Sequence, residues 1–130
     1  MKINNLKSCN DYIAKHKIEM IDLKCIDLTG YLHHITLPVF PNILAKLLDE
    51  GVGFDGSSFG FRKVENSDMI LIPDLNTAVI DPFRSVPTLS FYANIFLTDE
   101  KRTPFSQDSR HLARQAETIL KKVTGIDKSM

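Results

Sequence analysis

Apolar and polar residues alternate near the start of the chain, over residues 18–28. The residues on the apolar face are Ile21, Leu23 and Cys25. When apolar and polar residues alternate with a period of two residues, successive side chains lie on opposite faces of a strand. Residues 29–30 (Thr-Gly) have the composition of a turn, and residues 31–37 return as a second extended run that Pro38 ends. We therefore expect an antiparallel β-hairpin over this part of the chain.

Three other segments carry the sequence signals of a helix. The first begins at residues 8–11, whose Ser-Cys-Asn-Asp sequence has the form of a capping box. The second starts at Pro41 and ends at Gly51, with an apolar stripe made of Ile43, Leu44, Leu47 and Leu48. The third is capped by Asp108 and ends at Gly125, with a stripe made of Leu112, Ala116, Ile119, Leu120 and Val123. We expect the second helix, of about ten residues, to pack on the sheet.

The remaining extended segments complete the predicted sheet. Residues 69–72 are continuously apolar, which indicates a central strand covered on both faces. Residues 76–80 form a brief extended piece, and residues 88–97 are rich in aromatic and β-branched side chains and form the longest predicted strand. Residues 99–104 are charged and close with a proline, as an exposed linker would. Four or five strands, one helix among them and helices at both ends predict an α+β fold.

Composition limits the classes of protein to be considered. At 130 residues, 43% of them hydrophobic, the chain can form one domain with its own core. Sixteen basic and sixteen acidic residues cancel, so no nucleic-acid partner is expected. The longest apolar runs fall well short of the roughly 20 residues that span a bilayer. Because the first residues also lack the apolar segment of a secretion signal, we expect a cytoplasmic protein with no membrane partner.

The cysteines and the paired histidines do not have the spacing of a metal site. Cys9 and Cys25 are expected to be free thiols, buried or partly buried. His33 and His34 are adjacent, so on a strand they point to opposite faces and cannot chelate one metal together. We therefore expect no metal site in this chain.

Glycine is concentrated in one stretch, where four of the six glycines fall within residues 51–60. Asp55, Ser57 and Ser58 lie among them. Glycine lets the backbone take left-handed conformations and lets other groups approach it closely, so this stretch is suited to presenting a carboxylate and two hydroxyls. A second interpretation stays open, in which the Asp and Ser side chains only close local turns of an irregular connection.

An ordered set of short motifs in and after this stretch resembles a known family. The motifs are Phe54-Asp55-Gly56-Ser57-Ser58, Gly60-Phe61, Asn66-Ser67-Asp68-Met69, Pro73-Asp74, Thr77-Ala78 and Asp81-Pro82-Phe83. Together they resemble the N-terminal domain of bacterial-type (class I) glutamine synthetase, and the resemblance runs from about residue 20 to residue 125. It implies an N-terminal helix (1–17), a β-grasp domain (18–101), and a linker with the first helix of a catalytic domain (102–130). The family usually has proline where Ser109 stands, and serine is acceptable in a first helical turn.

The resemblance also implies an activity that this chain would not carry alone. Glutamine synthetases join ammonia to glutamate through γ-glutamyl phosphate, using ATP and divalent metals held by glutamates of the catalytic domain. ATP and Mg²⁺ or Mn²⁺ are thus implied for a full-length enzyme and no cofactor for this chain. The implied partner is the catalytic domain of an adjacent subunit in a homo-oligomer. The alternative from another class is a free-standing β-grasp interaction module, or a regulator of a full-length synthetase.

The implied site lies in the glycine-rich stretch and would act on the neighbouring subunit. By position, Asp55 would attract ammonium and assist its deprotonation, and Ser58 would line the ammonium pocket. Asp68 would either join them or hold the shape of the loop, and both roles stay open. Phe59 and Phe61 would pack either on the neighbour or on the domain's own core, and these alternatives also stay open.

Overall fold

The computed structural model describes residues 5–59 and 68–125. The elements in chain order are α1 (Leu6–Lys15), β1 (Met20–Ile26), β2 (Leu32–Pro38), α2 (Ile43–Asp49), β3 (Val52–Asp55), the 3₁₀ turn η1 (Gly56–Phe59), β4 (Asp68–Pro73), the 3₁₀ turn η3 (Leu75–Thr77), β5 (Val79–Ile80), β6 (Thr88–Leu97) and α3 (Ser109–Thr124). Within the described residues no helix is both long and apolar enough to cross a membrane.

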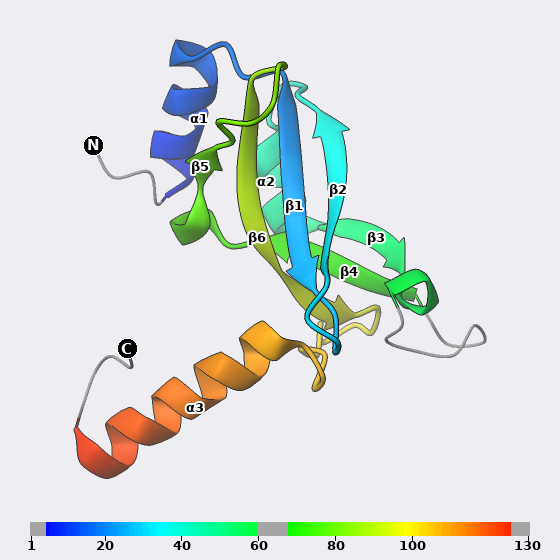
Figure 1. Ribbon diagram of the computed structural model, residues 1–130, viewed down its shortest axis with the longest axis vertical. Coiled ribbons are helices and arrows are strands. Elements are labelled where there is room, and N and C mark those ends of the chain that lie inside the picture. Colours follow the sequence, from blue (N-terminus) through cyan, green and yellow to red (C-terminus); the bar gives the residue numbers. More distant parts are fainter. Residues whose placement is uncertain (1–4, 60–67, 126–130) are drawn as a thin grey trace.

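The strands form one mixed sheet in the order β2-β1-β6-β4-β3, with the short β5 beside β6 (Figure 1). The pair β1–β6 is parallel, and the other pairs are antiparallel. Strand β6 is therefore the element that joins the β1–β2 hairpin to the β3–β4 hairpin. The predicted α+β class, with a mixed sheet, a packed helix and helices at both ends, is confirmed.

The core lies on one face of this sheet. Its buried residues include Ile21, Leu23 and Cys25 of β1, Leu89, Phe91, Ala93 and Ile95 of β6, Met69 and Leu71 of β4, Ile43, Leu44 and Leu47 of α2, and Cys9 of α1. The period of two in β1 and the three-and-four spacing in α2 thus point their apolar side chains to the same core, as the sequence predicts. The opposite face carries the polar side chains of β1.

Both early helices differ from their predicted bounds because other residues cap them. Helix α1 begins at Leu6, since the Asn5 side chain accepts the Ser8 amide at 2.8 Å and the Ser8 hydroxyl accepts the Asn5 amide at 3.1 Å. Ser8 is the last residue of the capping box, at helix position N3, and not its first. Helix α2 has seven residues, because Asn42 takes a left-handed conformation (φ 62°) and so leaves Pro41 outside the helix.

Two predictions about the strands need correction. The glycine-rich stretch opens with strand β3, a strand that neither interpretation of the sequence included. Strand β4 is not covered equally on both faces, because Met69 and Leu71 are buried while Ile70 and Ile72 are only half-buried. It lies inside the sheet, but β6 is the central strand. Strand β6 itself has its predicted bounds.

Helix α3 projects away from the sheet (Figure 1). None of its sixteen residues, all of which are described, is buried. Its two ends match the sequence prediction, because Asp108 caps the first turn and Gly125 ends the helix in a left-handed conformation (φ 74°).

Candidate functional site at the end of the β3–β4 hairpin

Two carboxylates lie opposite each other at the end of the β3–β4 hairpin where the chain leaves β3 and enters β4. Asp55 is the last residue of β3 and pairs in register with Asp68, the first residue of β4. Both residues are exposed. Because residues directly opposite each other in an antiparallel pair have neighbouring side chains, this register places two negative charges close together on one face of the hairpin. The sequence singled out both residues but did not place them on facing strands.

The chain that leaves β3 is held in a tight turn by Asp55. The Oδ1 atom of Asp55 accepts a hydrogen bond from the Ser57 amide at 2.9 Å and another from the Ser57 hydroxyl at 2.7 Å. The turn continues into η1, where Ser58 is exposed. Asp55 and Ser57 therefore close a local turn, and the same turn fixes the direction of the carboxylate. The side chain of Phe59 and all of Phe61 lie outside what the structure describes. Whether they pack on the neighbour or on the domain's own core therefore stays open.

The tip of the β1–β2 hairpin lies at the same end of the sheet (Figure 1) and is held by a residue that the sequence analysis missed. The Oδ1 atom of Asp27 accepts the Thr29 amide at 2.9 Å, the Thr29 hydroxyl at 2.7 Å and the Tyr31 amide at 3.0 Å. Its Oδ2 atom lies 2.8 Å from Nε2 of His33. The hydrogen bond from His33, followed by those from Thr29 and Tyr31, holds the pKa of the Asp27 carboxyl well below its usual range.

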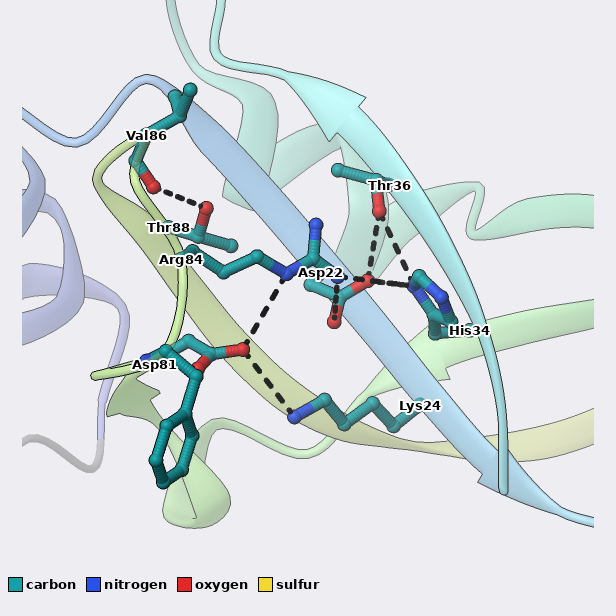
Figure 2. A network of polar contacts seen from close by, with 9 residues as sticks. Asp22, Lys24, His34, Thr36, Asp81, Arg84, Val86 and Thr88 are labelled. Carbon is teal, nitrogen blue, oxygen red and sulfur yellow. Dashed lines mark hydrogen bonds and ion pairs between the residues drawn. The ribbon is translucent and has the colours of Figure 1, made fainter. Parts of the chain in front are cut away.

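A second polar cluster lies on the polar face of the sheet around the buried carboxylate of Asp22 (Figure 2). Its Oδ1 atom lies 2.9 Å from Nδ1 of His34 and accepts the Thr36 hydroxyl at 3.0 Å, and its Oδ2 atom accepts from Arg84 at 3.4 Å. Because a carboxylate only accepts hydrogen bonds, Nδ1 of His34 carries the proton. The alternation over residues 18–28 puts Asp22 on the polar face of the strand but does not predict its burial.

The Asp22 cluster is balanced in charge and belongs to the framework of the fold. Nε of Arg84 lies 3.6 Å from Oδ2 of Asp81, which is also 4.0 Å from Nζ of Lys24. Two carboxylates thus meet two permanent cations, and the loop after β5 is fastened across β1. The fully buried Asp22 cannot reach a ligand from solvent, so this cluster stabilises the fold instead of forming a binding site.

The thiols and histidines have the structural roles expected of them. Cys9 and Cys25 are free and buried. Burial, with smaller effects from the carboxylates of Asp108 and Asp27, raises the pKa of Cys25 to about 12, so this thiol is not a nucleophile at neutral pH. His33 and His34 have separate aspartate partners. Among the described residues, no group of three His, Cys, Asp or Glu side chains is placed to hold a metal ion.

Comparison with known proteins identifies what this arrangement is similar to. The family model described as glutamine synthetase, beta-Grasp domain, matches residues 17–98. Glutamine synthetase of Mycobacterium tuberculosis is 42% identical over 106 residues, which are 80% of this chain and 22% of that protein. Glutamine synthetase of Pseudomonas aeruginosa is 38% identical over 115 residues, 88% of this chain and 24% of that protein. The chain therefore spans less than a quarter of the length of these relatives.

Solved structures show the same fold. The cryo-EM structure of Plasmodium falciparum glutamine synthetase superposes with a TM-score of 0.78 at 20% identity, over 94% of this chain and 23% of that chain. A structure titled apo GmaS without ligand superposes with a TM-score of 0.74 at 18% identity, over 91% of this chain and 26% of that chain. At these identities the likeness shows the fold alone.

Proposed function

The chain belongs to the glutamine synthetase family, as its N-terminal β-grasp domain, and from this premise we propose that it supplies the ammonium site of an ATP-dependent ligase that makes glutamine from glutamate. The observation that carries the proposal is the pairing of Asp55 with Asp68 beside the turn that Ser57 closes. The matches to whole synthetases do not favour the alternative of a free-standing interaction module.

The chemistry of ammonium agrees with this pair of carboxylates. Ammonium carries one positive charge and four N–H donors, so it prefers acceptor oxygens in a partly dry pocket. We assign to Asp55 the attraction of ammonium and the removal of its proton, which creates the nucleophile that attacks an acyl phosphate. The exposed hydroxyl of Ser58 would line the pocket. Asp68 would contribute a second negative charge from the facing strand.

This site would be completed by another part of the enzyme. We propose that the partner is the catalytic domain of an adjacent subunit in a homo-oligomer, and that this domain holds ATP and Mg²⁺ or Mn²⁺. The β-grasp domain would cover residues 18–101, after an N-terminal helix (1–17), and residues 102–130 would lead into the chain's own catalytic domain. An enzyme that uses glutamate and ATP in this way would work in the cytoplasm.

Replacement of the candidate base tests the proposal. In a full-length synthetase with this N-terminal domain, Asp55→Asn keeps the size of the side chain but removes its charge and its basicity. We expect ammonium-dependent synthesis to fall about 10²–10⁴-fold, the usual scale for loss of a general base. Formation of γ-glutamyl phosphate, which needs no ammonium, should decline much less. Asp11→Asn, an equal change at an exposed position of α1, should leave both activities unchanged.

Mixed oligomers test whether the site serves the neighbouring subunit. A subunit carrying Asp55→Asn is combined with a subunit inactivated in its own catalytic domain. Activity should return at the interfaces where an intact loop meets an intact catalytic domain. Full activity of Asp55→Asn alone would show that the loop is only a structural turn. Proven mixing without recovery of activity would disprove the action across subunits.

A further inference from the structure

Helix α3 has no buried residue, yet the chain that leads into it is firmly attached to the sheet. Residues 103–108 run along β6, where the Thr103 carbonyl accepts the Leu97 amide at 2.9 Å and the Ile95 carbonyl accepts the Phe105 amide at 2.9 Å. The Phe105 side chain is buried in the core. The start of α3 is therefore fixed in position, and the remaining question is what fixes its direction.

Asp108 links the first turn of α3 directly to the central strand. Its side chain is buried and is 1% exposed. The Oδ1 atom accepts the Arg110 amide of α3 at 3.1 Å, and the Oδ2 atom accepts the Ile95 amide of β6 at 3.1 Å. Each oxygen of this buried carboxylate thus has a backbone partner, one on the helix and one on the sheet, so Asp108 cannot turn without leaving a buried amide unpaired.

Arg110, two residues further along the same turn, makes contacts in three directions. Its Nη2 atom donates to Oδ2 of Asp74 at 2.6 Å, and its Nε atom donates to Oδ1 of Asn94 at 3.2 Å. The centre of the guanidinium lies 5.6 Å from the ring centroid of Tyr92. A planar guanidinium held by two hydrogen bonds and a contact with an aromatic ring has a defined orientation, which a flexible ammonium would not have.

The partners of Arg110 are themselves fixed to the sheet. Asn94 and Tyr92 are residues of β6. The Asp74 amide donates to the Tyr92 carbonyl at 2.8 Å, and Oδ1 of Asp74 accepts the Asn76 amide at 3.1 Å as the cap of η3. The contacts of Arg110 therefore end on a rigid surface.

We infer that Asp108 and Arg110 form a rigid joint that sets the direction of α3 relative to the sheet, with Arg110 as the positioning residue. The joint holds the helix without burying any of its side chains, because it acts only on the first turn. It does not depend on the proposed enzymatic function. Its consequence is that the apolar stripe of α3 is presented at one defined angle to the sheet.

Residual dipolar couplings of backbone amides test this joint on the 130-residue chain itself. In the wild type, couplings from the first turns of α3 should fit the alignment tensor of the sheet with the same magnitude. In Arg110→Ala, α3 should need a separate tensor of smaller magnitude. Arg110→Lys should show the same loss, because one ammonium cannot reproduce three directed contacts. Arg114→Ala, an exposed arginine one turn further along, is the matched control and should behave as the wild type.

A second variant guards against misfolding of the arginine mutants. Asp74→Asn weakens the joint from the side of the sheet and can still cap η3 through its amide oxygen, so we expect the sheet to keep its chemical shifts while α3 loses alignment. Averaged couplings of α3 in the wild type would overturn the inference. So would a folded Asp74→Asn or Arg110→Ala variant in which α3 keeps the tensor of the sheet.

Discussion

Gly51 lies where the end of α2 meets β4, and its backbone is left-handed (φ 69°). A Cβ atom at this position would overlap the Ile70 side chain and lie 2.7 Å from the Leu71 carbonyl oxygen. We expect Gly51→Ala to lower the free energy of unfolding by about 2 kcal/mol or more, because left-handed strain adds to the steric overlap. Urea denaturation measures the loss. Gly53→Ala is the control, since nothing lies within 4 Å of its added Cβ, and equal losses in the two variants would contradict this account.

The turn held by Asp27 predicts a pH-dependent contribution to stability. Its carboxyl pKa is lowered by the hydrogen bonds from His33 and Thr29. A lowered pKa means that the contribution is fully present above the unfolded pKa of about 3.9 and is lost as the pH falls towards the lowered value. Asp27→Asn should therefore be less stable than the wild type at pH 6, and the gap should narrow below about pH 4.

The urea midpoints of the wild type and of Asp27→Asn across this pH range measure how much ionised Asp27 contributes to stability. Asp11→Asn, at an exposed position of α1, should show no such pH-dependent gap. A difference in stability between the wild type and Asp27→Asn that stays constant through the acid range would show that the turn does not depend on ionised Asp27.

At this scale the sequence indicated some residues of the candidate site and could not indicate others of structural weight. Asp55, Ser58 and Asp68 were singled out as candidates because short motifs mark the stretch that contains them, and their roles stay predictions. The buried position of Asp22 was not foreseeable, because its partner Arg84 is far along the chain and no local pattern relates the two. Asp27 was equally hidden, since its turn sequence does not show that one carboxylate accepts three hydrogen bonds.

At the level of elements, the sequence predicted the helices and strands that follow from a local pattern of side chains. It did not predict those that depend on pairing with a distant strand. Strand β6 has its predicted bounds because aromatic and β-branched residues run through its whole length. Strand β3 was missed because Gly51 and Gly53 interrupt its pattern, and its extended form depends on pairing with β4. Helix α2 starts later than predicted, because Asn42 before its first residue takes a left-handed conformation that composition does not reveal.

Helix α3 should be the least protected of the long elements in hydrogen exchange. Its apolar stripe is exposed, with Val123 at 75% and Ile119 at 61%, so its amides can open without disturbing the core. We expect its amides beyond the first turn to exchange faster than those of β6. Native-state exchange followed by NMR measures this, with β6 as the internal reference. Equal protection in α3 and β6 of a proven monomer would contradict it.

For the whole molecule, the proposed function predicts weak interaction of this chain with nucleotides, because it assigns ATP and the metal ions to the catalytic domain. Among the described residues, no group of three His, Cys, Asp or Glu side chains is placed to hold a metal ion. Calorimetric titration with ATP and Mg²⁺ or Mn²⁺ should therefore show no tight site. A dissociation constant in the low micromolar range, about −8 kcal/mol, would place the nucleotide chemistry on this chain after all. A full-length synthetase that binds nucleotide provides the positive control.

The place of β6 between the two hairpins has a consequence for the order in which the chain can fold during synthesis. The β1–β2 hairpin leaves the ribosome before the other strands, and the strand that pairs with the other edge of β1 is made only after β3, β4 and β5. Until then that edge, with Ile21 and Leu23 beside it, has no native partner. Distant pairing of this kind closes slowly, and an open apolar edge is where newly made chains mispair. The stage at which only this hairpin has been made is thus the stage at which the edge of β1 is open to mispairing.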